Sequence, residues 1–162
     1  MKTVIVYYSL SGNCEYVAGL AAEKLGADLL KLEPVKAYPD SGFRKYFWGG
    51  KSAVMGEKPE LLPYDFDAGK YDRIIFTFPV WAGSPTPPIN TFVSENREAL
   101  RSKKLAALIC FSGGGGDKAL GKLKTMLGVD SLESELVLVD PKDKPDPENE
   151  KRIEVFCESL KE

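Results

Sequence analysis

Short apolar segments rich in β-branched residues alternate with helical patterns along most of this 162-residue chain. Strands are predicted at residues 3–8, 28–32, 73–78, 105–111 and 136–139. Between them, apolar residues recur every three or four positions, which is the spacing of an amphipathic helix. A helical crossover returns the chain so that consecutive strands run in the same direction. The alternation therefore predicts an α/β fold with a doubly wound five-stranded parallel sheet, in the strand order 2-1-3-4-5.

Glycine, proline and capping residues mark the ends of the predicted helices. Gly26 and Gly128 follow amphipathic patterns and end them, because glycine readily adopts the left-handed conformation found after a helix. Thr86 precedes two prolines and predicts a helix start whose first turn is capped by the threonine hydroxyl. Asp146, followed by proline, marks the start of the last helix. These boundaries leave residues 34–72 as an irregular crossover between the second and third strands.

The charge and residue content of the chain exclude several classes of function. The formal net charge is −2 and the basic residues form no stripe, so we expect no nucleic-acid partner and no capture by an anionic membrane. The chain contains no histidine, which excludes histidine triads, histidine-ligated zinc and imidazole proton shuttles. We therefore expect an organic cofactor to carry any demanding chemistry.

The cysteines and the short apolar runs bear on location and domain organisation. Cys14, Cys110 and Cys157 are far apart in the sequence, so they predict reduced thiols and no cysteine-ligated metal. No run approaches the ~20 apolar residues of a membrane span, and the first apolar run is too short for a signal peptide. We expect one cytoplasmic domain covering residues 1–162, and the sequence leaves its oligomeric state open.

Three loops follow the first, third and fourth predicted strands, at the edge where doubly wound sheets bind ligands. The first, residues 9–14, has two serines and a glycine at the start of a helix. The free N–H groups and the dipole of a helix start favour an anion. A phosphate would be held here by neutral donors, because the loop contains no lysine or arginine. The alternative is an ordinary helix capped by serine.

The second and third loops contain a tryptophan and a run of glycines. Trp81 lies in the segment 78–85, among prolines and small residues, where a rigidly held indole is suited to stacking against an aromatic ring. The alternative is that Trp81 only closes the core. The segment 112–116 contains four consecutive glycines, which favours close approach of the backbone to a ligand over a merely flexible turn.

Together these loops resemble those of the flavodoxin family, over nearly the whole chain and most clearly over residues 3–26 and 71–128. In that family the first loop binds the phosphate of FMN, and the other two flank its isoalloxazine ring. The resemblance implies a short-chain, FMN-binding member whose phosphate contacts are Ser9, Ser11, Gly12, Asn13 and Cys14. It implies that the ring is lined by Pro79, Val80, Trp81, Ala82 and Gly83, and at its other edge by Ser112, Gly113, Gly114 and Gly115.

Two departures from the family pattern affect the expected site. Cys14 stands where the family has a threonine, and a thiol is a weaker donor than a hydroxyl, so we expect Cys14 to contribute less phosphate affinity than Ser11. The acidic surface of flavodoxin electron carriers is nearly absent, since the loops near the flavin contain only Asp117, balanced by Lys118. A neutral pocket disfavours the anionic hydroquinone less, so we expect a hydroquinone that is less strongly reducing than in acidic carriers.

The crossover contains an aromatic cluster, from Tyr38 to Trp48, and a helix is expected near residues 43–54. Two interpretations of the cluster stay open. It packs over the core, or it forms a cover over the flavin or a surface for a partner or second copy. Basic residues in and beside the cluster suit an anionic substrate such as a nicotinamide dinucleotide: Arg44, Lys45 and Lys51.

Two functions of different classes follow from the resemblance. The first is an oxidoreductase that passes electrons from NAD(P)H to a small acceptor such as a quinone, with the flavin carrying the chemistry and no catalytic side chain. The second is a non-enzymatic flavodoxin electron carrier that docks to protein redox partners. The near-neutral charge and the aromatic insertion favour the enzyme, whereas an acidic rim would have favoured the carrier. A scaffold that binds no flavin is the remaining alternative.

Overall fold

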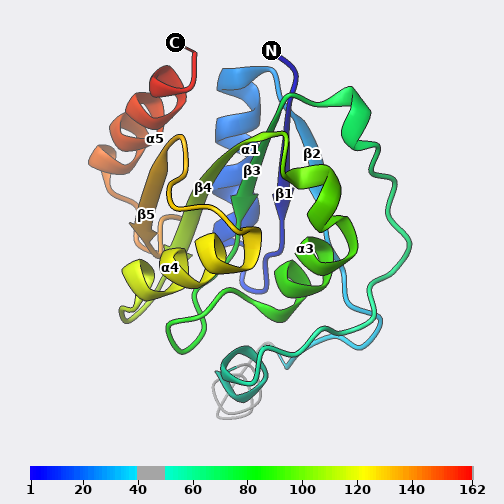
Figure 1. Cartoon of the computed structure of the whole chain (residues 1–162). Helices are drawn as coiled ribbons and strands as arrows, with labels where there is room; N and C mark the ends of the chain where they lie inside the picture. The colour runs from blue at the N-terminus through cyan, green and yellow to red at the C-terminus, as the bar shows by residue number, and fades with distance from the viewer. Residues whose placement is uncertain (40–49, 162) are drawn as a thin grey trace.

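The structure is a computed structural model, and it describes residues 1–39 and 50–161. In this part of the chain, five strands form one parallel sheet in the order β2-β1-β3-β4-β5, which confirms the predicted fold (Figure 1). The strands are β1 (Thr3–Tyr7), β2 (Asp28–Lys31), β3 (Arg73–Thr77), β4 (Lys104–Phe111) and β5 (Glu135–Val139). The helices labelled in Figure 1 are α1 (Asn13–Leu25), α3 (Pro87–Leu100), α4 (Gly116–Leu127) and α5 (Pro147–Ser159). A short 3-10 helix, η1 (Ala68–Lys70), precedes β3.

The central strands are apolar on both sides because helices cover both faces of the sheet. Every residue of β1 and β3 is buried, and Ile5 pairs with Ile75 in the middle of the sheet. The edge strand β2 is mostly exposed, and Leu29 keeps 48% of its surface accessible. A continuous apolar run therefore marks a central strand here, whereas β2 admits polar residues.

Helices α1 and α5 cover one face of the sheet, and α3 and α4 cover the other (Figure 1). The first face is a buried cluster that joins sheet and helices through Ile5, Leu108, Val17 and Phe156. The second face is a larger cluster that includes Phe76, Ile109, Phe92 and Leu123. Because both faces are covered, a ligand has access to the strands only at their ends.

Two predicted helix starts differ in how they are capped. At the start of α5, the Asp146 carboxylate accepts a hydrogen bond from the Glu148 N–H at 2.9 Å, as expected. The predicted hydroxyl cap of α3 is wrong. Thr86 occupies the capping position, but its hydroxyl is buried and has no partner among the described residues. Pro88, at the second helical position, has no N–H, and the N–H of Ile89, at the third, donates to the Thr86 carbonyl at 3.0 Å, so neither is left for the hydroxyl.

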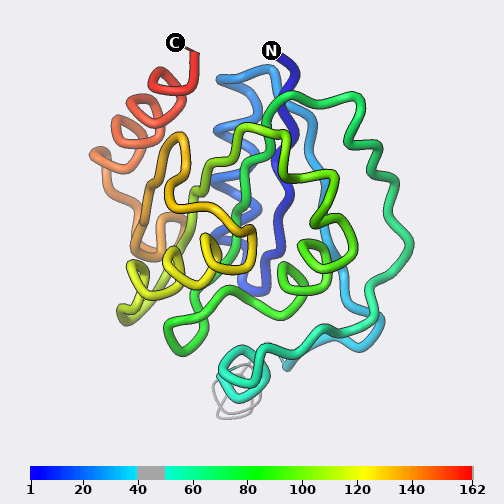
Figure 2. The backbone as a smooth tube through the Cα atoms, in the orientation of Figure 1, coloured from blue at the N-terminus to red at the C-terminus, as the bar shows by residue number. Residues whose placement is uncertain are grey.

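The described residues of the crossover between β2 and β3 lie past the carboxyl ends of the strands and then along one edge of the molecule up to the start of β3 (Figure 2). Two polar side chains of α3 hold it in place. The Asn90 amide donates to the Glu57 carbonyl at 3.1 Å, and the Thr91 hydroxyl donates to the Pro59 carbonyl at 2.7 Å. These contacts explain why a helix buried against the sheet carries buried polar residues.

Most of the predicted aromatic cluster and most of the helix expected near residues 43–54 lie outside the described residues. Residues 50–54 are helical, in agreement with the end of that predicted helix. Within residues 1–39 and 50–161, no helix is long and apolar enough to cross a lipid bilayer.

Candidate functional site

A cavity of ≈ 820 Å³ lies at the carboxyl ends of β1, β3 and β4, where the three predicted ligand loops meet. This volume is within the range of small-molecule and cofactor sites. Every residue that was predicted to contact phosphate or ring lines the cavity, except Gly12. The lining also contains residues absent from the predicted contacts: Leu10, Gly50, Cys110, Phe111, Lys118 and Asp140.

The first loop brings an uncapped helix start to the cavity. Gly12 precedes α1 with a φ of 96°, in the left-handed region that favours glycine. The Ser9 hydroxyl accepts a hydrogen bond from the Gly12 N–H at 3.2 Å, and no side chain caps the first turn of α1. The alternative of an ordinary serine-capped helix is therefore wrong. The first N–H groups of α1 are left for an anion.

Asn13 ties this loop to the loop that follows β5. Its side-chain oxygen accepts hydrogen bonds from the backbone N–H groups of Lys142 at 2.8 Å and Asp143 at 3.3 Å. Its side-chain nitrogen donates to the Asp143 carboxylate at 2.9 Å and to the Ser11 hydroxyl at 3.2 Å. Because the Asn13 amide is engaged on both sides, only its backbone N–H is left for a ligand.

A cation from the same distant loop lies beside Gly12. A Cβ added at Gly12 would be 2.8 Å from the Nζ atom of Lys142. The sequence led us to expect neutral donors alone, because residues 9–14 contain no basic residue. That expectation is incomplete, since the fold places the ammonium of Lys142 next to the loop.

The second loop turns tightly at Trp81. The Trp81 and Ser84 backbones exchange two hydrogen bonds of 3.0 Å, and the two residues between them have positive φ angles, 50° at Ala82 and 68° at Gly83. Positive φ at both central positions is the conformation of a type I′ turn. Trp81 is half-buried, lines the cavity and belongs to neither core cluster, so the alternative that it only closes the core is wrong.

Two tyrosines hold the indole from the side. The ring of Tyr38 lies 5.2 Å from that of Trp81 and the ring of Tyr8 lies 5.8 Å from it, both nearly perpendicular to the indole. Such edge-to-face contacts are favourable for aromatic pairs. Burial raises the pKa of Tyr8 well above its usual value, and burial with the charge of Glu57 raises the pKa of Tyr38 to about 12. Both phenols are therefore neutral at physiological pH.

The glycines of the third loop serve different purposes. Gly113 and Gly114 have open space where a Cβ would be. Gly115 precedes α4 with a φ of 84°, and a Cβ there would lie 2.9 Å from the Cα of Gly83. Packing between the two ring-lining loops thus requires Gly115, whereas the first two glycines leave their backbone accessible to a ligand.

Lys118 and Asp140 add charge to the cavity wall. The Asp140 carboxylate accepts a hydrogen bond from the Ser112 hydroxyl at 2.7 Å and pairs with the Lys144 ammonium at 3.2 Å. Asp140 also has a φ of 36°, which is uncommon for a residue other than glycine. Its position directly after the fifth predicted strand was a signal for this site, because parallel strands end at the same edge. The prediction that only Asp117 and Lys118 place charges near the flavin is therefore incomplete, because Asp140 also lines the cavity.

Cys14 and Cys110 lie next to each other in the cavity lining. Both thiols are free and buried, and both residues line the cavity. Burial and the neighbouring Cys110 raise the pKa of the Cys14 thiol well above its usual value. Cys14 is therefore a neutral thiol and a weak donor.

Comparisons with known proteins agree with this fold. A flavoprotein from Lactobacillus acidophilus NCFM, solved in complex with FMN, matches with a TM-score of 0.71 at 21% identity, over 88% of this chain and 95% of its own. A protein of Bacteroides eggerthii DSM 20697, assigned as a flavoprotein, gives 0.77 at 17% identity over 99% and 98% of the two chains. Oxidised flavodoxin 2 of Bacillus cereus gives 0.60 at 18% identity, over 99% and 98%.

At these identities the structural matches establish a shared fold. A comparison with curated protein sequences finds no match. The family model described as flavodoxin matches residues 2–138, which is most of the chain. The resemblance predicted from the three loops is thus confirmed, and the chain belongs to the flavodoxin family.

Proposed function

We propose that this chain is a single-domain cytoplasmic flavoprotein that binds FMN in the cavity at the carboxyl ends of β1, β3 and β4. The main support is that three loops with the flavodoxin pattern line one cavity of ≈ 820 Å³. The similarly folded L. acidophilus protein was solved in complex with FMN, which supports the same cofactor. When bound, FMN supplies the transfer of electrons or a hydride.

The first loop would hold the phosphate of FMN. The hydroxyls of Ser9 and Ser11 and the uncapped N–H groups of α1 are the donors that a phosphate needs. We expect Gly12, Asn13 and Cys14 to contribute through their backbones, because the Asn13 amide is engaged elsewhere and the Cys14 thiol is buried.

The second and third loops would hold the isoalloxazine ring. The perpendicular tyrosine rings fix Trp81 at the cavity wall, with Pro79, Val80 and the Ala82-Gly83 turn beside it. Ser112 and the glycines 113–115 form the opposite wall, where open backbone can approach the ring edge. These residues would orient the ring and exclude water from it, and no side-chain acid or base is required.

The activity that we propose is electron transfer from NAD(P)H to a small acceptor such as a quinone. Lys118 favours it, because this side chain lines the cavity and a cation there attracts an anionic dinucleotide. The second candidate is an electron carrier that docks to protein redox partners, which the family itself supports.

Anaerobic mixing of the FMN-loaded protein with NADH or NADPH separates these candidates. Rapid bleaching of the flavin absorbance supports the reductase. Bleaching that occurs only after a separate flavodoxin reductase is added supports the carrier. A protein that shows no flavin absorbance after incubation with FMN and gel filtration would overturn the cofactor proposal and leave a scaffold.

A further inference from the structure

The loop after β5 reaches the phosphate loop although the two are far apart in sequence. Asn13 is 6% exposed, and its amide binds the backbones of Lys142 and Asp143 and the carboxylate of Asp143. A buried amide with several hydrogen bonds is a firm attachment point. The backbone at residues 142–143 is therefore held against the start of α1.

Because of this attachment, the Lys142 side chain lies beside Gly12. A Cβ added at Gly12 would lie 2.8 Å from Nζ, 3.6 Å from Cδ and 3.8 Å from Cε of Lys142. The ammonium thus lies within contact distance of position 12, at the end of an exposed side chain. Glycine is required at position 12 by its φ of 96° and not by the lysine.

The Lys142 ammonium has no anionic partner in the part of the chain that the structure describes. The next lysine in the loop, Lys144, pairs with Asp140 at 3.2 Å. The adjacent carboxylate, Asp143, is bound by the Asn13 amide. The charge of Lys142 is therefore available to a ligand.

A lysine at this place is unfavourable without an anion. The start of a helix carries partial positive charge from its unpaired N–H groups, and it repels an ammonium. An anion bound to the first loop would be attracted by both the helix start and the lysine. The arrangement is thus complementary to a doubly charged ligand group.

We propose that Lys142 is a phosphate-binding residue and makes the site select a flavin phosphomonoester over the unphosphorylated flavin. This inference rests on the proposed FMN site and adds a charged residue that its loop motif lacks. The loop after β5 thereby becomes part of the cofactor site, held in place by Asn13.

Affinities of FMN and riboflavin measured side by side test this role. The two share the ring and ribityl chain, and only FMN has the phosphate. For Lys142→Gln at low ionic strength we expect the Kd for FMN to rise about ten-fold, with the Kd for riboflavin unchanged. Added salt should weaken FMN binding more in the wild type than in this variant, because salt screens the charge. Lys142→Arg should keep most of the preference for FMN.

Lys151→Gln is the matched control. This lysine is exposed on α5 and pairs with Glu148 at 3.3 Å, so its loss changes the net charge equally without touching the cavity. Neither glutamine variant should lower the midpoint of thermal unfolding appreciably, because both lysines are exposed.

The outcomes separate this inference from the proposed function. A Lys142→Gln variant that keeps the wild-type ratio of FMN to riboflavin affinity overturns the inference alone. A wild type that binds inorganic phosphate at the amides of the first loop, but not FMN, overturns the proposed function, and Lys142→Gln should then weaken phosphate binding. A wild type that binds neither overturns both.

Discussion

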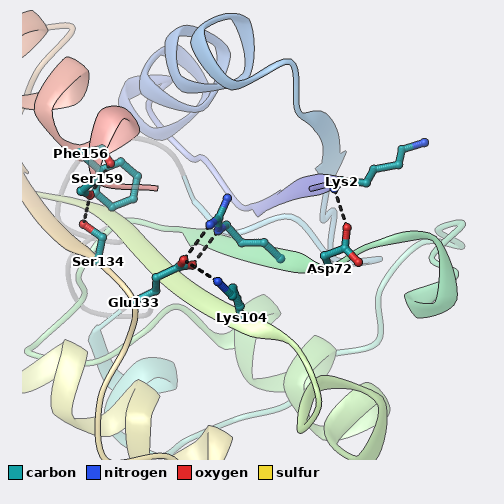
Figure 3. A network of polar contacts seen from close by, with 8 residues as sticks. Lys2, Asp72, Lys104, Glu133, Ser134, Phe156 and Ser159 are labelled. Atoms are coloured by element: carbon teal, nitrogen blue, oxygen red, sulfur yellow. Dashed lines mark hydrogen bonds and ion pairs between the residues drawn. The ribbon is translucent and has the colours of Figure 1, made fainter. Parts of the chain in front are cut away.

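Polar groups at the two ends of the parallel sheet differ in how they are partnered. At the amino end, the Arg73 guanidinium donates two hydrogen bonds of 2.7 Å to the Glu133 carboxylate, and the Lys104 ammonium lies 3.6 Å from it (Figure 3). At the carboxyl end, α1 and α4 each begin after a left-handed glycine, Gly12 or Gly115, without a side-chain cap. The charged groups at the amino end are paired within the chain, whereas the starts of α1 and α4 at the carboxyl end leave N–H donors for a ligand.

Contacts at the amino end also secure both ends of the chain. The Lys2 backbone N–H donates to the Asp72 carboxylate at 2.7 Å, and the Ser159 hydroxyl donates to the Ser134 hydroxyl at 3.0 Å (Figure 3). Groups that stabilise the fold thus lie at the amino end of the sheet, and groups available to a ligand lie at its carboxyl end. Changes at the amino end should alter stability alone, and changes at the carboxyl end should alter FMN affinity.

The largest stability effect is expected for Glu133→Ala. Arg73 has a side chain only 4% exposed, so removal of the carboxylate leaves a buried guanidinium without its partner. We expect the free energy of unfolding to fall by about 3 kcal/mol in urea denaturation. The Kd for FMN should stay within two-fold of wild type. Glu98→Ala, which breaks the exposed pair with Arg101, should cost less than about 0.5 kcal/mol. A loss of FMN affinity in Glu133→Ala would contradict the expectation that changes at the amino end alter stability alone.

Gly115→Ala should affect both properties. The new Cβ would lie 2.9 Å from the Cα of Gly83, and the φ of 84° strains any residue with a side chain. We expect a loss of about 2 kcal/mol in stability and at least about ten-fold in FMN affinity, because the two ring-lining loops must separate. Gly121→Ala, later in α4 and not among the residues that line the cavity, is the control, since its Cβ meets open space. Equal effects of the two substitutions would contradict this account.

The amino-end pair also predicts a pH dependence. Hydrogen bonds from Arg73 lower the pKa of the Glu133 carboxyl. A carboxyl with a lowered pKa in the folded state stabilises the fold above its unfolded pKa, and this contribution is lost as the pH falls through the folded value. The stability difference between wild type and Glu133→Gln should therefore be constant near neutral pH and shrink below about pH 4. Urea denaturation between pH 7 and pH 3 measures it, and a difference that grows with acidification would refute the pairing.

At the carboxyl end, Lys118→Gln should make the bound flavin harder to reduce. Lys118 lines the cavity, and its positive charge would stabilise negative charge on reduced flavin, whereas Asp140 is paired with Lys144. We expect the two-electron potential to fall by on the order of 30 mV, equivalent to about a ten-fold change in relative affinity for the reduced form. Spectroelectrochemical titration measures this shift, with Lys151→Gln as control. An unchanged potential would show that Lys118 does not act on the ring.

The smallest effect is expected at Cys14. Its thiol is buried and contacts Cys110, so Cys14→Thr should change FMN affinity less than Ser11→Ala. Loss of the Ser11 hydroxyl should weaken FMN binding about five-fold, the value of one ordinary hydrogen bond. Fluorescence quenching of FMN on titration with each variant gives both constants. A larger loss for Cys14→Thr would mean that the thiol position contacts the ligand directly.

Strands, helices and the three ligand loops could be predicted because their signals are local. Apolar runs and helical spacing depend on neighbouring residues, and parallel strands place the loops after β1, β3 and β4 at one edge. The alternation of segments therefore led to the strand order and to the residues that line the cavity, including Trp81. The hydroxyl cap at Thr86 was predicted wrongly because Pro88 offers no N–H and the Ile89 N–H donates to the Thr86 carbonyl instead of the hydroxyl.

The charges of the site were decided by tertiary structure. Asn13 and Asp143 are separated by 130 positions, and Arg73 and Glu133 by 60. No periodic pattern links such residues, because their contact depends on how a loop folds back over a helix start or a strand end. The loop at residues 9–14 could be predicted to bind an anion from its glycine and serines together with its position after the first predicted strand. The cation beside this loop could not be predicted from the sequence. Lys142 lies beside Gly12 only because α5 packs against α1 and the loop after β5 lies against the start of α1.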